Sequence, residues 1–331
     1  MQRKPSSSRR LVAIAAGVAL VVAGVAAVAG AAPARVAPYS YVALGDSFSA
    51  GEGVAPFLQG GACHRSSRAY ATVVQPTGFA VPLYATASGG SPASSGRPNM
   101  YGSTRNVRSA GGVTWASWAC SGAKTTNVLP RTLGGTPQGT AASTQIDSAA
   151  LADADLVTLT IGGNDAGYVE VLVTCGLGSC NTPAFERGRA AIIDRTKPRL
   201  EKVYRAVAAA APHARIVVLG YPQPFPAARA RQACPALSPF RGEQDMLRRL
   251  GVRLNGTIAS AVAAVARSGV HIQFVPVAGR FEGHEVCGSK GAWINGILLS
   301  STGFGINPAS FHPTLAGQRA YGTAVNAALR S

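Results

Sequence analysis

Charged side chains are few in this sequence, and acidic ones are the scarcest. Only 14% of the 331 residues are charged, whereas 47% are hydrophobic. A chain with so little charge can bury a substantial core, which excludes a mainly disordered protein. With 31 Lys and Arg against 14 Asp and Glu, the formal net charge is +17. This surplus suits peripheral contact with an anionic membrane or cell envelope.

Two kinds of binding motif are missing. There is no Lys- or Arg-rich run and no basic stripe interleaved with aromatic residues, so we expect no nucleic-acid partner. There is also no C-x-x-C and no H-E-x-x-H spacing, because His284-Glu285 is followed by Val286-Cys287-Gly288. The sequence therefore argues against a zinc site.

A single long hydrophobic run lies near the amino terminus. Residues 11–30 are small or aliphatic and follow four basic residues, Arg3, Lys4, Arg9 and Arg10. Residues 29–31 and 32–34 both fit an A-x-A cleavage site. We therefore predict that residues 1–35 are a secretory signal peptide, and removing its four basic residues leaves a net charge of +13. An uncleaved anchor at residues 11–30 is the alternative, since the run is long enough to span a bilayer.

The six cysteines of an exported chain are expected to form three disulfides. Fifteen pairings are formally possible. Cys175 and Cys180 are close enough in sequence to close a small loop, which favours sequential pairing. The predicted pairs are Cys63–Cys120, Cys175–Cys180 and Cys234–Cys287.

Apolar, β-branched runs alternate with helical patterns along the chain. The predicted strands include residues 113–119, 155–161, 215–219 and 270–277, and the predicted helices include 63–74, 185–211 with a break near Pro198, 239–267 and 313–329. This alternation predicts an α/β fold with a parallel sheet covered on both faces. The Gly/Ser/Pro-rich residues 84–112 are expected to be irregular. No repeat or linker divides residues 36–331, so we expect one domain and a monomer.

Residues 39–53 read YSYVALGDSFSAGEG and contain a candidate nucleophile. An apolar strand ends at Gly45, and small polar residues follow, among them Asp46 and Ser47. A serine on a sharp turn at the carboxyl end of a strand points into the crevice where α/β sheets bind ligands. The alternative is an ordinary strand-to-helix turn, because Gly, Asp and Ser are common in such turns.

Three later positions complete a possible ester-hydrolysing site. Gly122 and the Gly163-Asn164 pair follow two other strands, and His312 precedes the last helix. Acyl transfer needs a serine, a base and donors for the oxyanion. The backbone N–H of Gly122 and the side-chain amide of Asn164 are candidate donors, and His312 is a candidate base. Each also has a structural alternative, as a turn glycine, a turn asparagine or a packing histidine.

Together these segments resemble the four blocks of the SGNH (GDSL) hydrolase family. The matching segments are GDSFSAGEG at residues 45–53, Gly122 in CSGA, GGND at 162–165 and HP at 312–313. The six cysteines and residues 281–287 are similar to the secreted actinobacterial lipase/esterase branch. The resemblance implies a flavodoxin-like α/β/α sandwich and ester hydrolysis without a metal or other cofactor. It also implies Ser47 as nucleophile, His312 as base, and Ser47 N–H, Gly122 N–H and Asn164 as the oxyanion hole. No G-x-S-x-G occurs, which argues against an ordinary α/β-hydrolase.

One position departs from the family pattern. The family has an acid three residues before its histidine, and this chain has Ala309 there. We predict that a backbone carbonyl, that of Ala309, orients the ring of His312 and gives a Ser–His dyad. Another acid, such as Asp165 or Glu285, is the alternative.

The sequence thus predicts a secreted serine ester hydrolase that acts on lipids or other acyl esters. The apolar residues 294–304 would suit a lipid–water interface, or they pack in the core. An envelope polysaccharide deacetylase or acyltransferase is the alternative among enzymes. The alternative that is not an enzyme is a non-catalytic envelope-binding domain. Such a domain has no need for Ser47, Gly122, Asn164 and His312 together.

Overall fold

The computed structural model describes residues 39–57, 63–76, 100–104, 112–139, 141–177, 180–228, 241–300 and 305–331. These residues form a six-stranded sheet in the order β2-β3-β1-β4-β5-β6. Five of its strands are parallel: β1 (Tyr39–Gly45), β3 (Val113–Ser117), β4 (Leu156–Thr160), β5 (Arg215–Leu219) and β6 (Ile272–Val275). Their order is that of flavodoxin-like sheets, in which the second parallel strand lies outside the first. The predicted α/β fold class is confirmed.

The remaining strand, β2 (Met100–Thr104), pairs antiparallel with β3 at the edge of the sheet. The sheet is therefore mixed, and the prediction that residues 84–112 are irregular is wrong for β2. The sequence MYGST lacks the apolar, β-branched run of the other strands. Pairing with the free edge of β3 supplies backbone hydrogen bonds that local propensity does not reveal.

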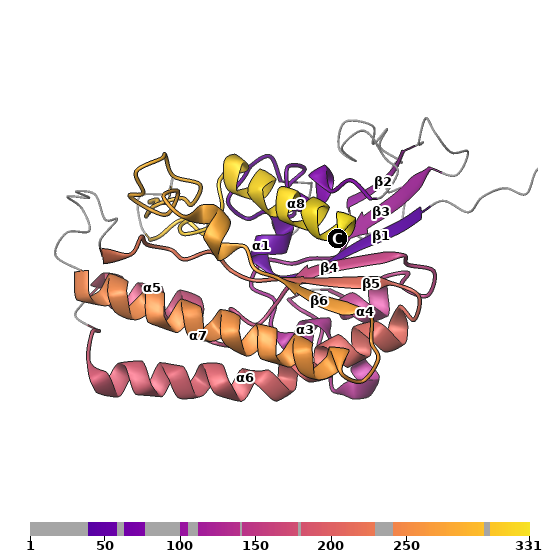
Figure 1. The fold of residues 1–331 in the computed structure, drawn as a ribbon, viewed down its shortest axis with the longest axis horizontal. Helices are drawn as coiled ribbons and strands as arrows, with labels where there is room; N and C mark the ends of the chain where they lie inside the picture. Colours follow the sequence, from indigo (N-terminus) through magenta and orange to yellow (C-terminus); the bar gives the residue numbers. More distant parts are fainter. Residues whose placement is uncertain are drawn as a thin grey trace, which may run out of the picture. The chain divides into compact units, whose positions relative to one another are not determined.

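Helices cover both faces of the sheet (Figure 1). On one face lie α6 (Pro183–Ala210) and α7 (Arg241–Ala266), which pack on each other. On the other face α8 (Leu315–Arg330) packs on η1 (Tyr70–Val73). The predicted interruption near Pro198 is wrong, because α6 continues through that residue. Of the helix predicted at residues 63–74, only η1 forms.

Several short elements connect these layers. They are α1 (Ser47–Ala50), α3 (Thr125–Val128), η2 (Arg131–Leu133), α4 (Gln145–Ser148), α5 (Tyr168–Leu177) and η5 (Ala278–Phe281). None of the helices in the described ranges is both long and apolar enough to cross a membrane.

The carboxyl ends of β1, β3 and β4 meet at one edge of the sheet. The N–H of Asp46, just after β1, donates to the carbonyl of Thr160 at the end of β4 over 3.0 Å. The N–H of Cys120, just after β3, donates to the carbonyl of Gly45, also over 3.0 Å. Because β1 lies between its two parallel neighbours, the turns that follow these strands share the crevice where such sheets bind ligands.

Two predicted disulfides are present. Cys63 is bonded to Cys120, and Cys175 is bonded to Cys180. Cys287 is also disulfide-bonded, whereas Cys234, its predicted partner, lies outside the described residues.

Candidate active site

The turn that carries Ser47 is held in a backbone conformation that requires glycine. Gly45 has a φ of 116°, and a Cβ there would lie 2.2 Å from the carbonyl oxygen of Thr160. The side-chain amide of Gln145 hydrogen-bonds both the N–H and the carbonyl of Gly45, each over 2.8 Å. Asp46 then caps α1 by accepting from the N–H of Phe48 over 3.1 Å. Ser47 is thus fixed at the first position after the turn.

Ser47 and His312 are in direct contact. Oγ of Ser47 lies 2.7 Å from Nε2 of His312, although the two residues are 265 positions apart. Both are buried, with 7% and 8% of their surface exposed. The ring of His312 also packs against Phe48, with ring centroids 5.0 Å apart. A serine hydroxyl at this distance from an imidazole nitrogen is placed to lose its proton to that nitrogen.

The carbonyl that orients the ring belongs to Ser310, so the prediction of Ala309 is wrong. Nδ1 of His312 lies 3.1 Å from the Ser310 carbonyl oxygen. The Ala309 carbonyl instead accepts from the His312 backbone N–H and from Nδ2 of Asn295, each over 3.2 Å. Phe311, which lies between Ser310 and His312, adopts a left-handed φ of 60°.

The two acids considered as alternative partners of His312 accept hydrogen bonds from other groups. Asp165 accepts from the N–H and the hydroxyl of Thr125, over 2.9 and 2.6 Å. Glu285 accepts from the N–H of Gly283 over 2.8 Å. Neither has a hydrogen bond to His312 in the part of the chain that the structure describes.

Burial lowers the pKa of His312, which favours the neutral imidazole that a base needs. The carboxylate of Glu52 opposes this effect and raises the pKa of His312, as do the backbone carbonyls of Pro308 and Ser310. Asp46 is also buried, and its burial raises its pKa to about 6. Its hydrogen bonds from Tyr221, Thr160 and Phe48 act in the opposite direction.

The candidate oxyanion donors come from the turns after β1, β3 and β4. The backbone N–H groups of Ser47 and Gly122 have no hydrogen-bond partner among the described residues. Asn164 uses one hydrogen of its amide to donate to the Ala123 carbonyl over 3.0 Å, which places it beside Gly122. Gly122 has a φ of 80°, a conformation that favours glycine.

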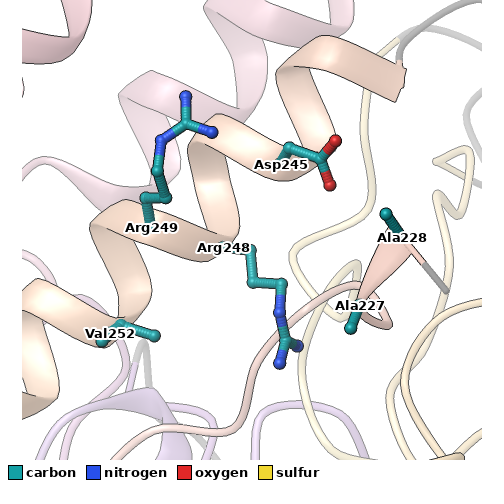
Figure 2. Close-up of a pocket in the computed structure, with 6 residues that line it drawn as sticks. All are labelled: Ala227, Ala228, Asp245, Arg248, Arg249 and Val252. Carbon is teal, nitrogen blue, oxygen red and sulfur yellow. The ribbon is translucent and has the colours of Figure 1, made fainter. Parts of the chain in front are cut away.

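Ser47, Asn164 and His312 line one small cavity of about 20 Å³. Its other walls are largely apolar, with Phe48, Tyr168, Pro222, Pro224 and Leu254 among them. A larger cavity of about 410 Å³ lies along α7, lined by Ala227, Ala228, Asp245, Arg248, Arg249 and Val252 (Figure 2). Arg249 is paired there with Glu186, and none of these residues is a nucleophile. No cluster of His, Cys, Asp or Glu that could hold a metal ion occurs in the described ranges.

Sequence reasoning missed several supporting residues. Tyr221, Gln145 and Ser310 hydrogen-bond Asp46, Gly45 and His312. Tyr221 could have been noticed, because it follows the strand that ends at Leu219. Gln145 lies in no recognisable motif, and Ser310 acts through its backbone, which any residue has.

Known proteins resemble this chain over most of its length. Lipase 1 of Streptomyces coelicolor is 32% identical over 306 residues, which cover 90% of this chain and 91% of that protein. The crystal structure of phospholipase A1 from Streptomyces albidoflavus has 30% sequence identity and a TM-score of 0.63, with 88% of this chain and 99% of that chain covered. The extracellular lipase of Streptomyces rimosus has 28% identity and the same TM-score and covers 88% of this chain and 99% of its own. The GDSL-like Lipase/Acylhydrolase family matches residues 43–320. The chain belongs to this family and is a carboxylic ester hydrolase.

Proposed function

We propose that the chain hydrolyses acyl esters of lipids through an acyl-enzyme at Ser47, with His312 as the general base. The observation that carries this proposal is the 2.7 Å contact between Oγ of Ser47 and Nε2 of His312. It is supported by the carbonyl of Ser310, 3.1 Å from the other ring nitrogen, which fixes the tautomer with its proton on Nδ1.

Two acyl transfers follow from this geometry. Oγ of Ser47 bonds to the ester carbonyl carbon while its proton passes to Nε2 of His312, and the resulting imidazolium returns that proton to the leaving alkoxide. Water then attacks the acyl-enzyme, with His312 taking the proton of the water and returning it to Oγ of Ser47. In both steps the negative carbonyl oxygen is stabilised by the N–H groups of Ser47 and Gly122 and by the amide of Asn164.

A lipid substrate is supported by an apolar surface on the hairpin that carries the base. Residues 294–300 and 305–313, here called the base hairpin, pair through the bridges Ile294–Pro313 and Leu299–Ile306. The base hairpin carries His312 near one end and four exposed apolar side chains toward the other: Ile297, Leu298, Leu299 and Ile306, with 44%, 40%, 75% and 42% of their surface exposed. We propose that these side chains contact a lipid surface. The net positive charge of the chain also attracts it to a surface of anionic lipids.

We further propose that residues 1–35 direct export and that residues 36–331 are the mature enzyme. Residues 36–331 form one compact unit. An exported chain is consistent with the disulfides at Cys63, Cys120, Cys175 and Cys180. A third disulfide between Cys234 and Cys287 completes the predicted set.

Hydrolysis of a p-nitrophenyl ester series, from acetate to palmitate, tests this function. We expect the exported enzyme to be active and Ser47→Ala to lose at least about a thousandfold in kcat. Ser67→Ala is the matched control, because the Ser67 hydroxyl has no hydrogen-bond partner among the described residues, and it should keep full activity. Activity confined to acetate would favour a polysaccharide deacetylase, and folded enzyme without activity on any ester would exclude the proposal.

A further inference from the structure

Glu52 is a buried acid that the proposed mechanism does not use. Only 2% of its surface is exposed, and both of its carboxylate oxygens lie 3.0 Å from Nδ1 of His64. Burying a carboxylate costs free energy unless the group is paired, and the contact with His64 offsets part of that cost. His64 itself reaches the surface, with 40% of its side chain exposed.

The backbone around Glu52 contacts Ser47 and the neighbours of His312. The N–H of Glu52 donates to the carbonyl of Ser47 over 3.0 Å. On the other side, a Cβ added at Gly53 would lie 2.2 Å from the carbonyl oxygen of Pro313, the residue after the base. Nδ2 of Asn295 reaches the Gly53 carbonyl over 3.2 Å, and the backbone N–H of Asn295 donates to the carbonyl of His312 over 2.9 Å. The turn that carries Glu52 therefore lies beside the backbone of Ser47 on one side and that of Pro313 on the other.

A strap of residues 63–66 holds His64 against this turn. The strap is bonded to the serine turn, where the N–H of Ser66 donates to the Ala50 carbonyl over 2.7 Å. It is also bonded to the loop that carries Gly122, through the Cys63–Cys120 disulfide and a 3.2 Å hydrogen bond from Arg65 to the Ala119 carbonyl. The Glu52–His64 pair is thus built into a rigid junction between two parts of the active site.

We propose that Glu52 is a positioning residue whose buried negative charge stabilises the imidazolium of His312, in place of the acid that the family carries where this chain has Ala309. The proposal rests on His312 being the base. It follows from the burial of Glu52 and from the contacts of its turn with Ser47 and Pro313. It agrees with the effect of the Glu52 carboxylate, which raises the pKa of His312. The carboxylates of Asp46, Asp165 and Glu285 accept hydrogen bonds from Tyr221, Thr125 and Gly283, as that of Glu52 does from His64.

The test is the pH dependence of kcat/KM for Glu52→Gln on a soluble p-nitrophenyl ester. Glutamine keeps the shape and can still accept a hydrogen bond from His64, but it carries no charge. Without that charge the pKa of His312 falls, so the acidic limb of the profile moves to lower pH by roughly half a unit to one unit. At the pH optimum kcat falls roughly tenfold, because the imidazolium formed during the reaction is less stable.

Three further variants separate the effect of the charge from that of the structure. Glu285→Gln removes another buried carboxylate, with 3% of that residue exposed, and should leave the acidic limb where it is in the wild type. Ala309→Asp, added to Glu52→Gln, restores an acid at the family position and should recover most of the lost kcat. If Glu52→Gln does not fold, His64→Lys offsets the same charge from the surface and should move the limb in the same direction by less.

An unmoved limb in Glu52→Gln, or in His64→Lys, with the protein folded would overturn the proposal. Covalent labelling of Ser47 by a fluorophosphonate keeps this result distinct from failure of the proposed function. Labelled, active enzyme with an unmoved limb rejects only the role of Glu52. Enzyme that is folded, unlabelled and inactive rejects the dyad itself.

Discussion

Tyr221 donates a hydrogen bond from its buried hydroxyl to Oδ2 of Asp46, 175 positions away in the sequence. The same hydroxyl accepts from the backbone N–H of Gly163 over 3.1 Å. One phenol thus connects the ends of β5, β1 and β4. It holds Asp46, which precedes Ser47, and Gly163, which precedes Asn164. The alignment of the proposed nucleophile with a proposed oxyanion donor therefore depends on a residue that touches neither reacting atom.

Tyr221→Phe should destabilise the protein by about 2–4 kcal/mol, because it leaves a buried carboxylate oxygen and a backbone N–H unpaired. We also expect kcat to fall roughly tenfold or more as the oxyanion donors lose their alignment. Denaturant unfolding and ester hydrolysis measure the two effects. Tyr204→Phe is the control, because the buried hydroxyl of Tyr204 has no hydrogen-bond partner in the part of the chain that the structure describes, and its removal should cost little. Equal losses in the two variants would contradict this role of Tyr221.

Asp46 should make stability depend on pH. Burial raises its pKa to about 6 from a usual value of 3.8, so the folded protein binds the proton more tightly than the unfolded chain does. This contribution to stability is complete below the unfolded pKa and is lost as the pH rises through about 6. In Asp46→Asn it is absent. As the pH is lowered from about 7 to about 3, the free energy of unfolding of the wild type should therefore rise by about 3 kcal/mol relative to that of the variant. Urea unfolding of both proteins across that range measures the gain, and a constant difference would show that the pKa of Asp46 is not raised.

The disulfides Cys63–Cys120 and Cys175–Cys180 should differ in what they stabilise. Cys63 and Cys120 are 57 residues apart, and Cys175 and Cys180 are 5 apart. Loop-closure entropy predicts a loss of about 4 kcal/mol when the first pair is replaced by serine and about 2 kcal/mol for the second. Only the first pair holds the loop that carries Gly122, so its loss should also lower kcat. Thermal unfolding and ester hydrolysis on both double variants test this, and a larger loss of kcat on removing the second pair would contradict it.

The base hairpin should matter only for aggregated substrate. Leu299→Ser removes the most exposed of its apolar side chains and should lower activity on emulsified triglyceride several-fold, since less apolar surface enters the lipid. Hydrolysis of soluble p-nitrophenyl acetate should not change. Val252→Ser on α7, where the apolar side chain is 59% exposed, is the control and should leave both activities intact. An equal loss on both substrates would assign Leu299 to the stability of the site instead.

The outline of this fold could be predicted from the sequence, because its signals are local. β5 forms at residues 215–219 as predicted, and the predicted strand at residues 155–161 contains β4, since each is a short run of buried β-branched and aliphatic residues. The candidate residues Ser47, Gly122, Asn164 and His312 were also recognisable, because each lies in a short motif. β2 was missed because an edge strand without an apolar pattern is selected by its neighbour.

Tertiary structure alone decided how the candidate residues are supported. The carbonyl of Ser310 and not that of Ala309 orients His312, because the choice depends on a left-handed residue at Phe311. The pairs Tyr221–Asp46 and His64–Glu52 join residues 175 and 12 positions apart. Residue types and local order are written in the chain, but a hydrogen bond across the sheet exists only once the strand order has brought its two ends together, and no local pattern encodes that order.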